Sequence, residues 1–347
     1  MRQFIYQNKI QTIGIIGLLF LFFGCNNSQD DTEESDIPES KNLTDYKSTE
    51  FILSPKHTLT AGNNSIYCSS FLFAWNKLKA DSEMTFKIPD EHFDLQLVDS
   101  SFDFLNSLSE EEIDLHSEIS EDRLYAKAYF KKSLPFEMAF KKDYGTDEFA
   151  GKKVQFFGCS GSDHLNLTRQ LQIIYYKNDS EFIVRLRPDD PQHRIYLYMP
   201  NEKPKNFETV FKDLYEKSLV GEEEMETEEK FIDYQFMPED DFAMPVINFN
   251  IENEYKQLIG NNVFADEKKF TVTQAEQQIA LVLNEKGAEV ESKAEVELSK
   301  SEEPEEELKK PKKLYLNKPF LLLLKKQDSP YPYLAIWIEN TELMVAK

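Results

Sequence analysis

The spacing of apolar residues changes along this chain and predicts a mixture of helices and strands. Residues 66–78 are apolar on nearly every side, which is typical of a buried helix. Residues 206–219 carry apolar side chains at helical intervals behind Asn206, a good N-cap. Residues 251–259 form a third, shorter helix candidate that ends at Gly260.

The second half of the chain is richer in short apolar runs, which predict β-strands. Turn-forming residues at 189–191 and 327–330 separate neighbouring runs. Because helices and strands do not alternate regularly, the pattern indicates an α+β domain rather than repeated βαβ units. The predicted strands are residues 153–157, 171–176, 182–187, 194–198, 246–251, 277–284, 314–325 and 333–339.

Two strongly charged segments interrupt this pattern. Residues 222–229 are almost all glutamate, and residues 292–313 are dense in Glu and Lys with two prolines. Both segments are expected to be exposed and mobile.

The N-terminus predicts a targeting signal. A short basic start is followed by an apolar run at residues 10–23, which is too short to span a bilayer and is typical of a secretory signal. The run ends at Gly24-Cys25, which resembles a bacterial lipobox. The resemblance implies cleavage before Cys25 and acylation of its thiol; an uncleaved membrane anchor is the alternative. No other run of 18 apolar residues occurs, so the rest of the chain is predicted to be soluble.

Residues 25–50 are polar, acidic and without apolar periodicity, so they are predicted to be a flexible tether. Ser28-Gln29-Asp30-Asp31 resembles the export signal of surface lipoproteins in Bacteroidetes-type bacteria; a plain solvated linker fits this segment equally well. We therefore expect a lipoprotein at the outer membrane or cell surface, with its domain in the periplasmic or extracellular space. Its membrane contact would be the lipid anchor alone.

Composition narrows the function classes. The chain has 347 residues and a formal charge of −23, and removal of residues 1–24 leaves 323 residues with a charge of −25. Such an acidic chain is not expected to bind nucleic acid, because phosphates would be repelled. A hydrophobic fraction of 40% with 27 Phe can fill a core, and three cysteines cannot form a disulfide framework.

The sequence offers little for catalysis. None of the five histidines has a close metal-ligand spacing, and no phosphate-binding glycine loop occurs, so neither a metal nor a cofactor is expected. Residues 158–162 resemble a nucleophile elbow, but Ser162 stands where that motif needs glycine, and a surface turn is predicted instead. Cys68 is expected in the buried helix and Cys159 at the turn; a disulfide between them stays open. We do not expect an enzyme, and no catalytic residue is assigned.

The order of features near the C-terminus closely resembles the serpin family. A buried strand runs into Asn284-Glu285-Lys286-Gly287, a long charged segment follows, and the chain returns through an apolar strand with Asn317-Lys318-Pro319-Phe320. In serpins, a sheet strand ends at a Glu-x-Gly hinge, an exposed reactive loop follows, and the chain re-enters the core through a strand with a Pro-Phe pair. Similar segments upstream are residues 64–69, 129–136, 171–188 and 244–260.

The resemblance implies a fold and also has departures. It implies a large mixed central β-sheet with additional sheets and surrounding helices, and an exposed reactive loop at about residues 287–313 of a domain spanning 51–347. Residues 78–124 are shorter than the corresponding region of the family, so the early helices are reduced. Leu134 stands where the family usually has tryptophan, and Cys68-Ser69 replaces a Ser-Pro pair.

The loop alternates strictly beyond the hinge residues Glu285, Gly287 and Ala288. Since strand side chains point to opposite faces in turn, an inserted loop would bury one row and expose the other. The small or apolar row is Ala288, Val290, Ser292, Ala294, Val296 and Leu298. The other row is almost entirely charged: Glu289, Glu291, Lys293, Glu295, Glu297 and Ser299.

The resemblance implies a suicide inhibitor of serine proteases, with cysteine proteases as a further target class. The cleaved loop would insert into the central sheet and trap the acyl-enzyme. Family spacing places the scissile region at Lys300, Ser301 and Glu302, which suits a trypsin-like or a glutamate-selective protease. The alternative is a non-inhibitory serpin-like binding lipoprotein whose loop is merely a protease substrate. A monomer is expected in either case.

Overall fold

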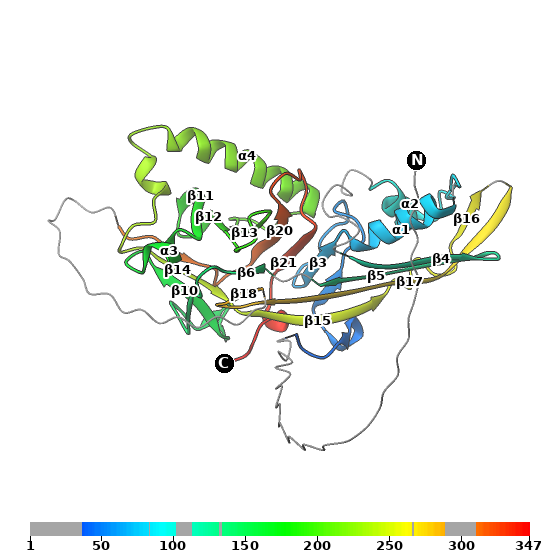
Figure 1. Ribbon diagram of the computed structural model, residues 1–347, viewed down its shortest axis with the longest axis horizontal. Helices are drawn as coiled ribbons and strands as arrows, with labels where there is room; N and C mark the ends of the chain where they lie inside the picture. Colours follow the sequence, from blue (N-terminus) through cyan, green and yellow to red (C-terminus); the bar gives the residue numbers. More distant parts are fainter. Residues whose placement is uncertain (1–36, 83, 102–112, 132–133, 266, 289–309) are drawn as a thin grey trace, which may run out of the picture. The chain divides into compact units, whose positions relative to one another are not determined.

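The computed structural model describes residues 37–347 except 83, 102–112, 132–133, 266 and 289–309. Its described residues combine three main β-sheets with helices, which confirms the α+β class and the large mixed sheet (Figure 1). Among the described residues, no helix is long and apolar enough to cross a membrane. The α-helices are α1 (Ser70–Ser82), α2 (Phe93–Asp99), α3 (Leu165–Thr168) and α4 (Phe207–Met225).

The central sheet is built around one long strand, β17 (Lys268–Leu283). Its neighbour on one side, β15, runs antiparallel to it, whereas its neighbour on the other side, β5, runs parallel to it. The next strand, β4, is antiparallel to β5, and α1 packs on β5 and β4 (Figure 1). The other strands of this sheet are β15 (Ile247–Glu254), β5 (Arg123–Lys131), β4 (Asp114–Ser120), β1 (Lys41–Asn42) and β16 (Asn262–Ala265).

The face of β17 that points into the core is set by a β-bulge. Phe270 and Val272 are buried, and the parallel register with β5 then shifts between Val272 and Gln274. After this shift the odd-numbered residues point inward, beginning with Ala275 and Gln277. One extra residue therefore reverses which side chains are buried, as a bulge does in any two-sided strand.

A seven-stranded sheet holds most of the remaining core. Every residue of the neighbouring strands β21 and β3 is buried. Its order is β11 (Leu171–Asn178), β12 (Glu181–Leu186), β13 (His193–Met199), β20 (Phe320–Lys326), β21 (Leu334–Ile338), β3 (Asn64–Cys68) and β2 (Thr49–Phe51). The third main sheet is β19 (Lys313–Tyr315), β14 (Asp241–Pro245), β10 (Phe156–Ser160) and β7 (Lys141–Lys142).

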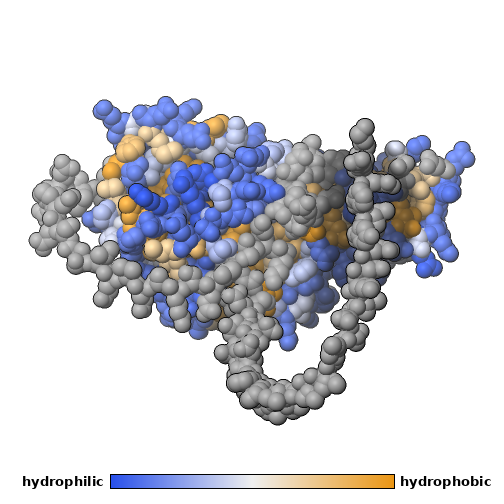
Figure 2. Space-filling view, viewed as in Figure 1, coloured by the Kyte–Doolittle hydropathy of each residue, from blue (hydrophilic) through white to orange (hydrophobic). Residues whose placement is uncertain are grey.

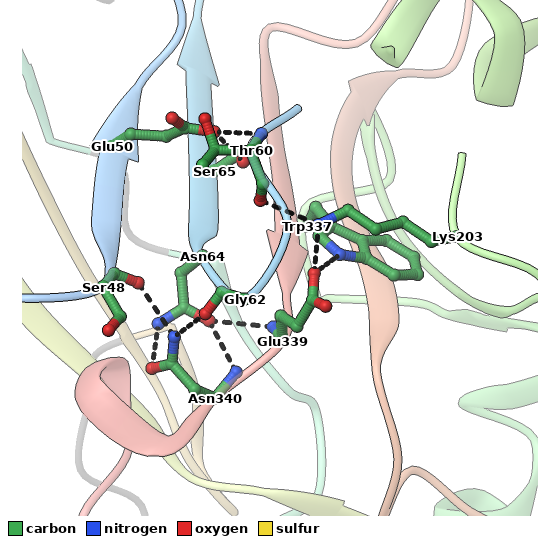
Figure 3. Close-up of polar contacts among 10 residues, drawn as sticks. All are labelled: Ser48, Glu50, Thr60, Gly62, Asn64, Ser65, Lys203, Trp337, Glu339 and Asn340. Atoms are coloured by element: carbon green, nitrogen blue, oxygen red, sulfur yellow. Dashed lines mark hydrogen bonds and ion pairs between the residues drawn. The ribbon is translucent and has the colours of Figure 1, made fainter. Parts of the chain in front are cut away.

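A buried amide, Asn64, ties the ends of β3 and β21 to the N-terminal segment. Its Oδ1 accepts from the backbone N–H groups of Glu339 and Asn340 at 2.8 and 3.0 Å, and its Nδ2 donates to Asn340 Oδ1 at 2.7 Å (Figure 3). Asn340 Nδ2 in turn donates to the carbonyls of Ser48 and Gly62 at 2.8 and 3.0 Å. These bonds satisfy polar groups that the core would otherwise leave unpaired.

One predicted helix, at 66–78, is wrong in part, and another, at 251–259, is wrong. Residues 64–68 form strand β3 and the helix begins at Ser70, because a strand buried on both faces is as continuously apolar as a buried helix. Residues 251–254 continue strand β15, and a turn follows in which Tyr255 N–H donates to the carbonyl of Ala275 at 2.7 Å. The predicted helix at 206–219 is confirmed and extends to Met225.

The domain begins earlier and its charged helix is longer than predicted. Residues 41–50 belong to the domain rather than to the predicted tether, because β1 pairs with β15 and β2 pairs with β3. The Glu342 carboxylate holds this segment by accepting from the N–H groups of Lys47 and Ser48 at 3.0 and 2.9 Å.

The glutamates at 222–224 continue α4, whose surface is mainly hydrophilic in Figure 2. The signal segment and Cys25 lie outside the described residues.

The cysteines differ from their predicted settings. Cys159 lies inside strand β10 and is fully buried rather than at a surface turn, and Cys68 ends strand β3. Both are free thiols. Burial raises the pKa of Cys68 to about 11 and raises that of Cys159 as well. Both side chains are therefore neutral and unreactive at neutral pH.

We expect alkylation with iodoacetamide at pH 8, without reductant, to spare both cysteines in the folded chain and to label both after unfolding. The physical reason is that the reactive thiolate form is suppressed by burial and becomes accessible only in the unfolded chain. Mass spectrometry of the labelled peptides locates the modification. A peptide in which Cys68 is crosslinked to Cys159 would contradict this assignment.

Candidate hinge at the end of the central sheet

The chain leaves β17 through a tight turn. Asn284 and Gly287 exchange two backbone hydrogen bonds of 3.1 Å each, and Asn284 Oδ1 accepts from Lys286 N–H at 2.9 Å. The carbonyls of Glu285 and Lys286 accept from Phe140 and Phe136 N–H, both at 2.8 Å. The predicted hinge is thus an ordered turn whose backbone groups are paired with a neighbouring segment.

Gly287 is required by the geometry of this turn. Its φ is +106°, a left-handed conformation that side chains other than glycine rarely adopt. A Cβ atom here would lie 2.5 Å from the carbonyl oxygen of Leu134 and 2.5 Å from Phe136 N. The glycine of the Glu-x-Gly motif is therefore fixed both by conformation and by the close approach of another backbone.

An ion pair holds the hinge from the side. Glu285 Oε1 lies 2.9 Å from Lys142 Nζ, and the Glu285 side chain is 9% exposed while that of Lys142 is 70% exposed. Because the lysine is solvated, the pair is expected to contribute modestly to stability. The buried carboxylate nevertheless depends on this partner, since an unpaired buried charge is costly.

The hinge turns the chain back beside β6, the described strand that comes after β5 in the sequence. Gly287 and Ala288 form the short strand β18 (Gly287–Ala288), which is antiparallel to β6 (Leu134–Pro135). The register places Gly287 opposite Pro135 and Ala288 opposite Leu134. Leu134, which stands where the resemblance expects tryptophan, is fully buried.

The far end of the loop is fixed in a different sheet. Lys312 is buried, its N–H donates to Asp240 Oδ1 at 2.7 Å, and its Nζ lies 2.8 Å from Asp240 Oδ2. Strand β19 begins at the next residue and pairs in parallel with β14. The remaining predicted loop residues lie outside the described residues: Val290, Ser292, Ala294, Val296 and Leu298 of the small row, and Lys300, Ser301 and Glu302 of the scissile region.

Sequence analysis missed a buried polar contact beneath the sheet. Gln277 is 2% exposed, and its Nε2 donates to the Cys68 carbonyl at 3.1 Å and to Ser70 Oγ at 2.8 Å. Its Oε1 accepts from Tyr255 OH, a hydroxyl that stays protonated because burial raises its pKa. This contact connects β17 to the start of α1. The available signal was a glutamine within an otherwise apolar row, since Gln277 alternates with Ile279 and Leu281.

Comparison with known proteins gave structural matches. No model of a known protein family matches the chain, and no curated protein sequence matches it. It is similar to the native thermophilic serpin tengpin at 11% identity and a TM-score of 0.47, covering 87% of this chain and 100% of tengpin. A serpin from Schistosoma mansoni matches at 13% identity and a TM-score of 0.35, over 64% of this chain and 57% of its own.

A further match is serine protease inhibitor (serpin)-12 of Manduca sexta, at 14% identity and a TM-score of 0.37, over 63% of this chain and 56% of its own. The fold is serpin-like on the chain's own topology. The long strand β17 ends at the Glu285–Gly287 hinge, and the chain returns through β19 and the apolar strand β20.

Replacing Gln277 with leucine is expected to destabilise the domain by about 2–3 kcal/mol, because Ser70, the Cys68 carbonyl and Tyr255 would lose a buried partner. Urea unfolding measures the change. Gln274→Leu on the exposed side of the same strand is the control and should stay within about 0.5 kcal/mol of the parent. Equal stability of the two variants would show that Gln277 does not hold β17 to α1.

Proposed function

We propose that this protein is a serpin-type inhibitor of serine proteases, displayed on the cell surface by a lipid at Cys25. Cysteine proteases form a second target class. A protease would attack the carbonyl carbon of a residue in the 300–302 region, expel the amine of the next residue and become esterified to the loop. The freed loop would then insert beside β17 and move the protease away before water can release the acyl group.

The observation that carries this proposal is the parallel pairing of β17 with β5. The pairing extends from Thr271–Arg123 to Ala280–Lys131, so nine residue pairs would have to separate. A single strand entering there from the hinge would run antiparallel to both neighbours. One parallel ladder would then become two antiparallel ladders, which are the more stable kind per residue.

The hinge also supplies a register for the inserted strand. Ala288 is already antiparallel to Leu134, and Leu134 is buried, as are the even-numbered residues of β5. Extending this pairing without a bulge places the small loop residues opposite buried positions of β5. The pairs would be Ser292 with Phe130, Ala294 with Ala128, Val296 with Ala126 and Leu298 with Leu124, whose β5 members are all at most 3% exposed.

The same register accounts for the charged row. Glu295 would face Lys127, which projects from the opposite, partly exposed side of β5 and now pairs with Glu276 of β17 at 3.0 Å. Separation of β5 from β17 would remove Glu276 from Lys127, and Glu295 would replace it. The small row thus fits the core side of the sheet between β5 and β17, and the charged row fits its solvent side.

Incubation of the full chain with a panel containing a trypsin-like and a glutamate-selective protease tests this function. We expect a covalent complex that survives SDS and a cleaved form with a markedly higher melting temperature, because insertion replaces one parallel ladder with two antiparallel ladders. Mass spectrometry of the released fragment identifies the scissile bond. The non-inhibitory alternative predicts stoichiometric cleavage without a complex and an unchanged melting temperature, and that result would refute our proposal.

The register gives a matched pair of variants at neighbouring positions. Ala294→Arg should lose most complex formation and become a substrate, because its charge would have to enter the core opposite Ala128. Glu295→Arg should keep forming the complex, since its side chain would stay in solvent beside Lys127. The ratio of complex to cleaved product measures the effect. Similar ratios for the two variants would contradict this register.

A further inference from the structure

A row of positive charges crosses three neighbouring strands of the seven-stranded sheet, β12, β13 and β20 (Figure 1). Arg194 of β13 lies directly opposite Lys325 of β20. Arg187 follows the last residue of β12, and the β12–β13 register continued by one residue places it on the other side of Arg194. At about 4.8 Å between strands, this cation row (Arg187, Arg194 and Lys325) spans about 10 Å.

The face that carries the cation row is covered at one end of the strands and open at the other. Tyr198 of β13 is buried at the covered end, where its hydroxyl donates to Asp213 of α4. Tyr196 and Arg194 come earlier on the same face and are partly exposed, and Arg187 is exposed. The cation row is therefore accessible from solvent.

Neutral oxygen atoms hold the arginines of this face in place. Gln172 Oε1 accepts from Arg187 Nη2 at 2.9 Å and also accepts from Arg185 of β12. Arg194 donates to Gln327 Oε1 at 2.5 Å and to two backbone carbonyls at 2.7 and 2.6 Å. These contacts orient the guanidinium groups and leave their charges uncompensated.

No carboxylate lies within ion-pair distance of the cation row or of Arg185 in the described part of the chain. Burial and the charges of Arg185 and Arg187 lower the pKa of Arg194, and the charge of Asp190 acts in the opposite direction. Like charges on directly opposed residues of neighbouring strands are unfavourable. In a chain with 63 acidic and 40 basic residues, this unpaired row indicates a site for an anion.

The sheet itself restricts the kind of anion. Both β12 and β13 are paired on each side, so an acidic peptide cannot add to them as a further strand. A long nucleic acid would be repelled by the net charge of −23, whereas a short ligand covers the row alone. Guanidinium groups bind phosphate through paired hydrogen bonds, and lysine binds it as a point charge.

We propose that the cation row binds a linear oligophosphate. Its linked phosphates lie across the strands and contact Arg187, Arg194 and Lys325 in turn. The site does not depend on the proposed inhibition of proteases.

Titration calorimetry of the full chain with tripolyphosphate at low ionic strength tests the proposal. Orthophosphate and hexaglutamate are the control ligands, because the first lacks linked phosphates and the second carries its charges on carboxylates. We expect tripolyphosphate to bind at least about tenfold more tightly than either control, since it alone contacts several cations through phosphate oxygens. A smaller advantage, or no saturable binding of tripolyphosphate at millimolar concentration, would overturn the proposal.

Two variants at the ends of the row locate the site. Arg187→Gln and Lys325→Gln should each weaken binding of tripolyphosphate about tenfold, because each removes one charge-assisted contact. Lys205→Gln, at an exposed lysine outside the row, is the matched control and should leave the affinity unchanged. Melting curves verify that the variants are folded. Unchanged affinity in either Arg187→Gln or Lys325→Gln would contradict binding along the row.

Discussion

The parallel seam between β5 and β17 is the constraint on which the rest of this structure depends. A parallel pair in the middle of a sheet can accept one strand of opposite direction if the two strands separate, and the hinge turns the described chain back in that direction at β18. The inner face of β5 carries Ala126 and Ala128, which are small enough for α1 to pack closely on this strand. Helix α1 therefore covers β5 on the core side of the sheet. The parallel order of β5 and β17 would still allow an antiparallel strand between them.

Contacts at two levels hold the seam closed in the described state. Beneath the sheet, Gln277 fixes β17 to Ser70 and Tyr255, and α1 packs on β5. At the end of the sheet, Gly287 and the Glu285–Lys142 pair hold the turn against the segment that follows β5. Separation of the strands thus requires loss of ladder bonds between β5 and β17, while the Gln277 contact can remain in place.

The hinge and the alternating loop could be predicted from the sequence because both depend on local residue patterns. A Glu-x-Gly motif at the end of an apolar strand, followed by strict alternation, does not need tertiary context to be recognised. The bulge at Val272–Gln274 could not be predicted in this way, since a register shift is decided by the partner strand. The predicted strand 277–284 is therefore shorter than β17. The helix prediction failed at residues 66–68 for a related reason. A strand that is buried on both faces lacks the alternation of apolar and polar residues that distinguishes a strand from a helix.

The two ends of the loop are held by different strand pairs, and this favours cleavage as the trigger of the proposed insertion. In the proposed register Leu298 would lie ten residues beyond Ala288, about 33 Å along β5 at the usual rise of a strand. Lys312 is held by Asp240 in the third sheet, so in an intact chain the residues after Leu298 would have to return that distance. Those residues are mainly glutamate and lysine with two prolines, and the side chains of Glu252 and Glu276 already lie on the solvent side of the central sheet. In the proposed mechanism, cleavage near Ser301 would remove the need to return, so the small row could enter between β5 and β17 while β19 stays paired with β14.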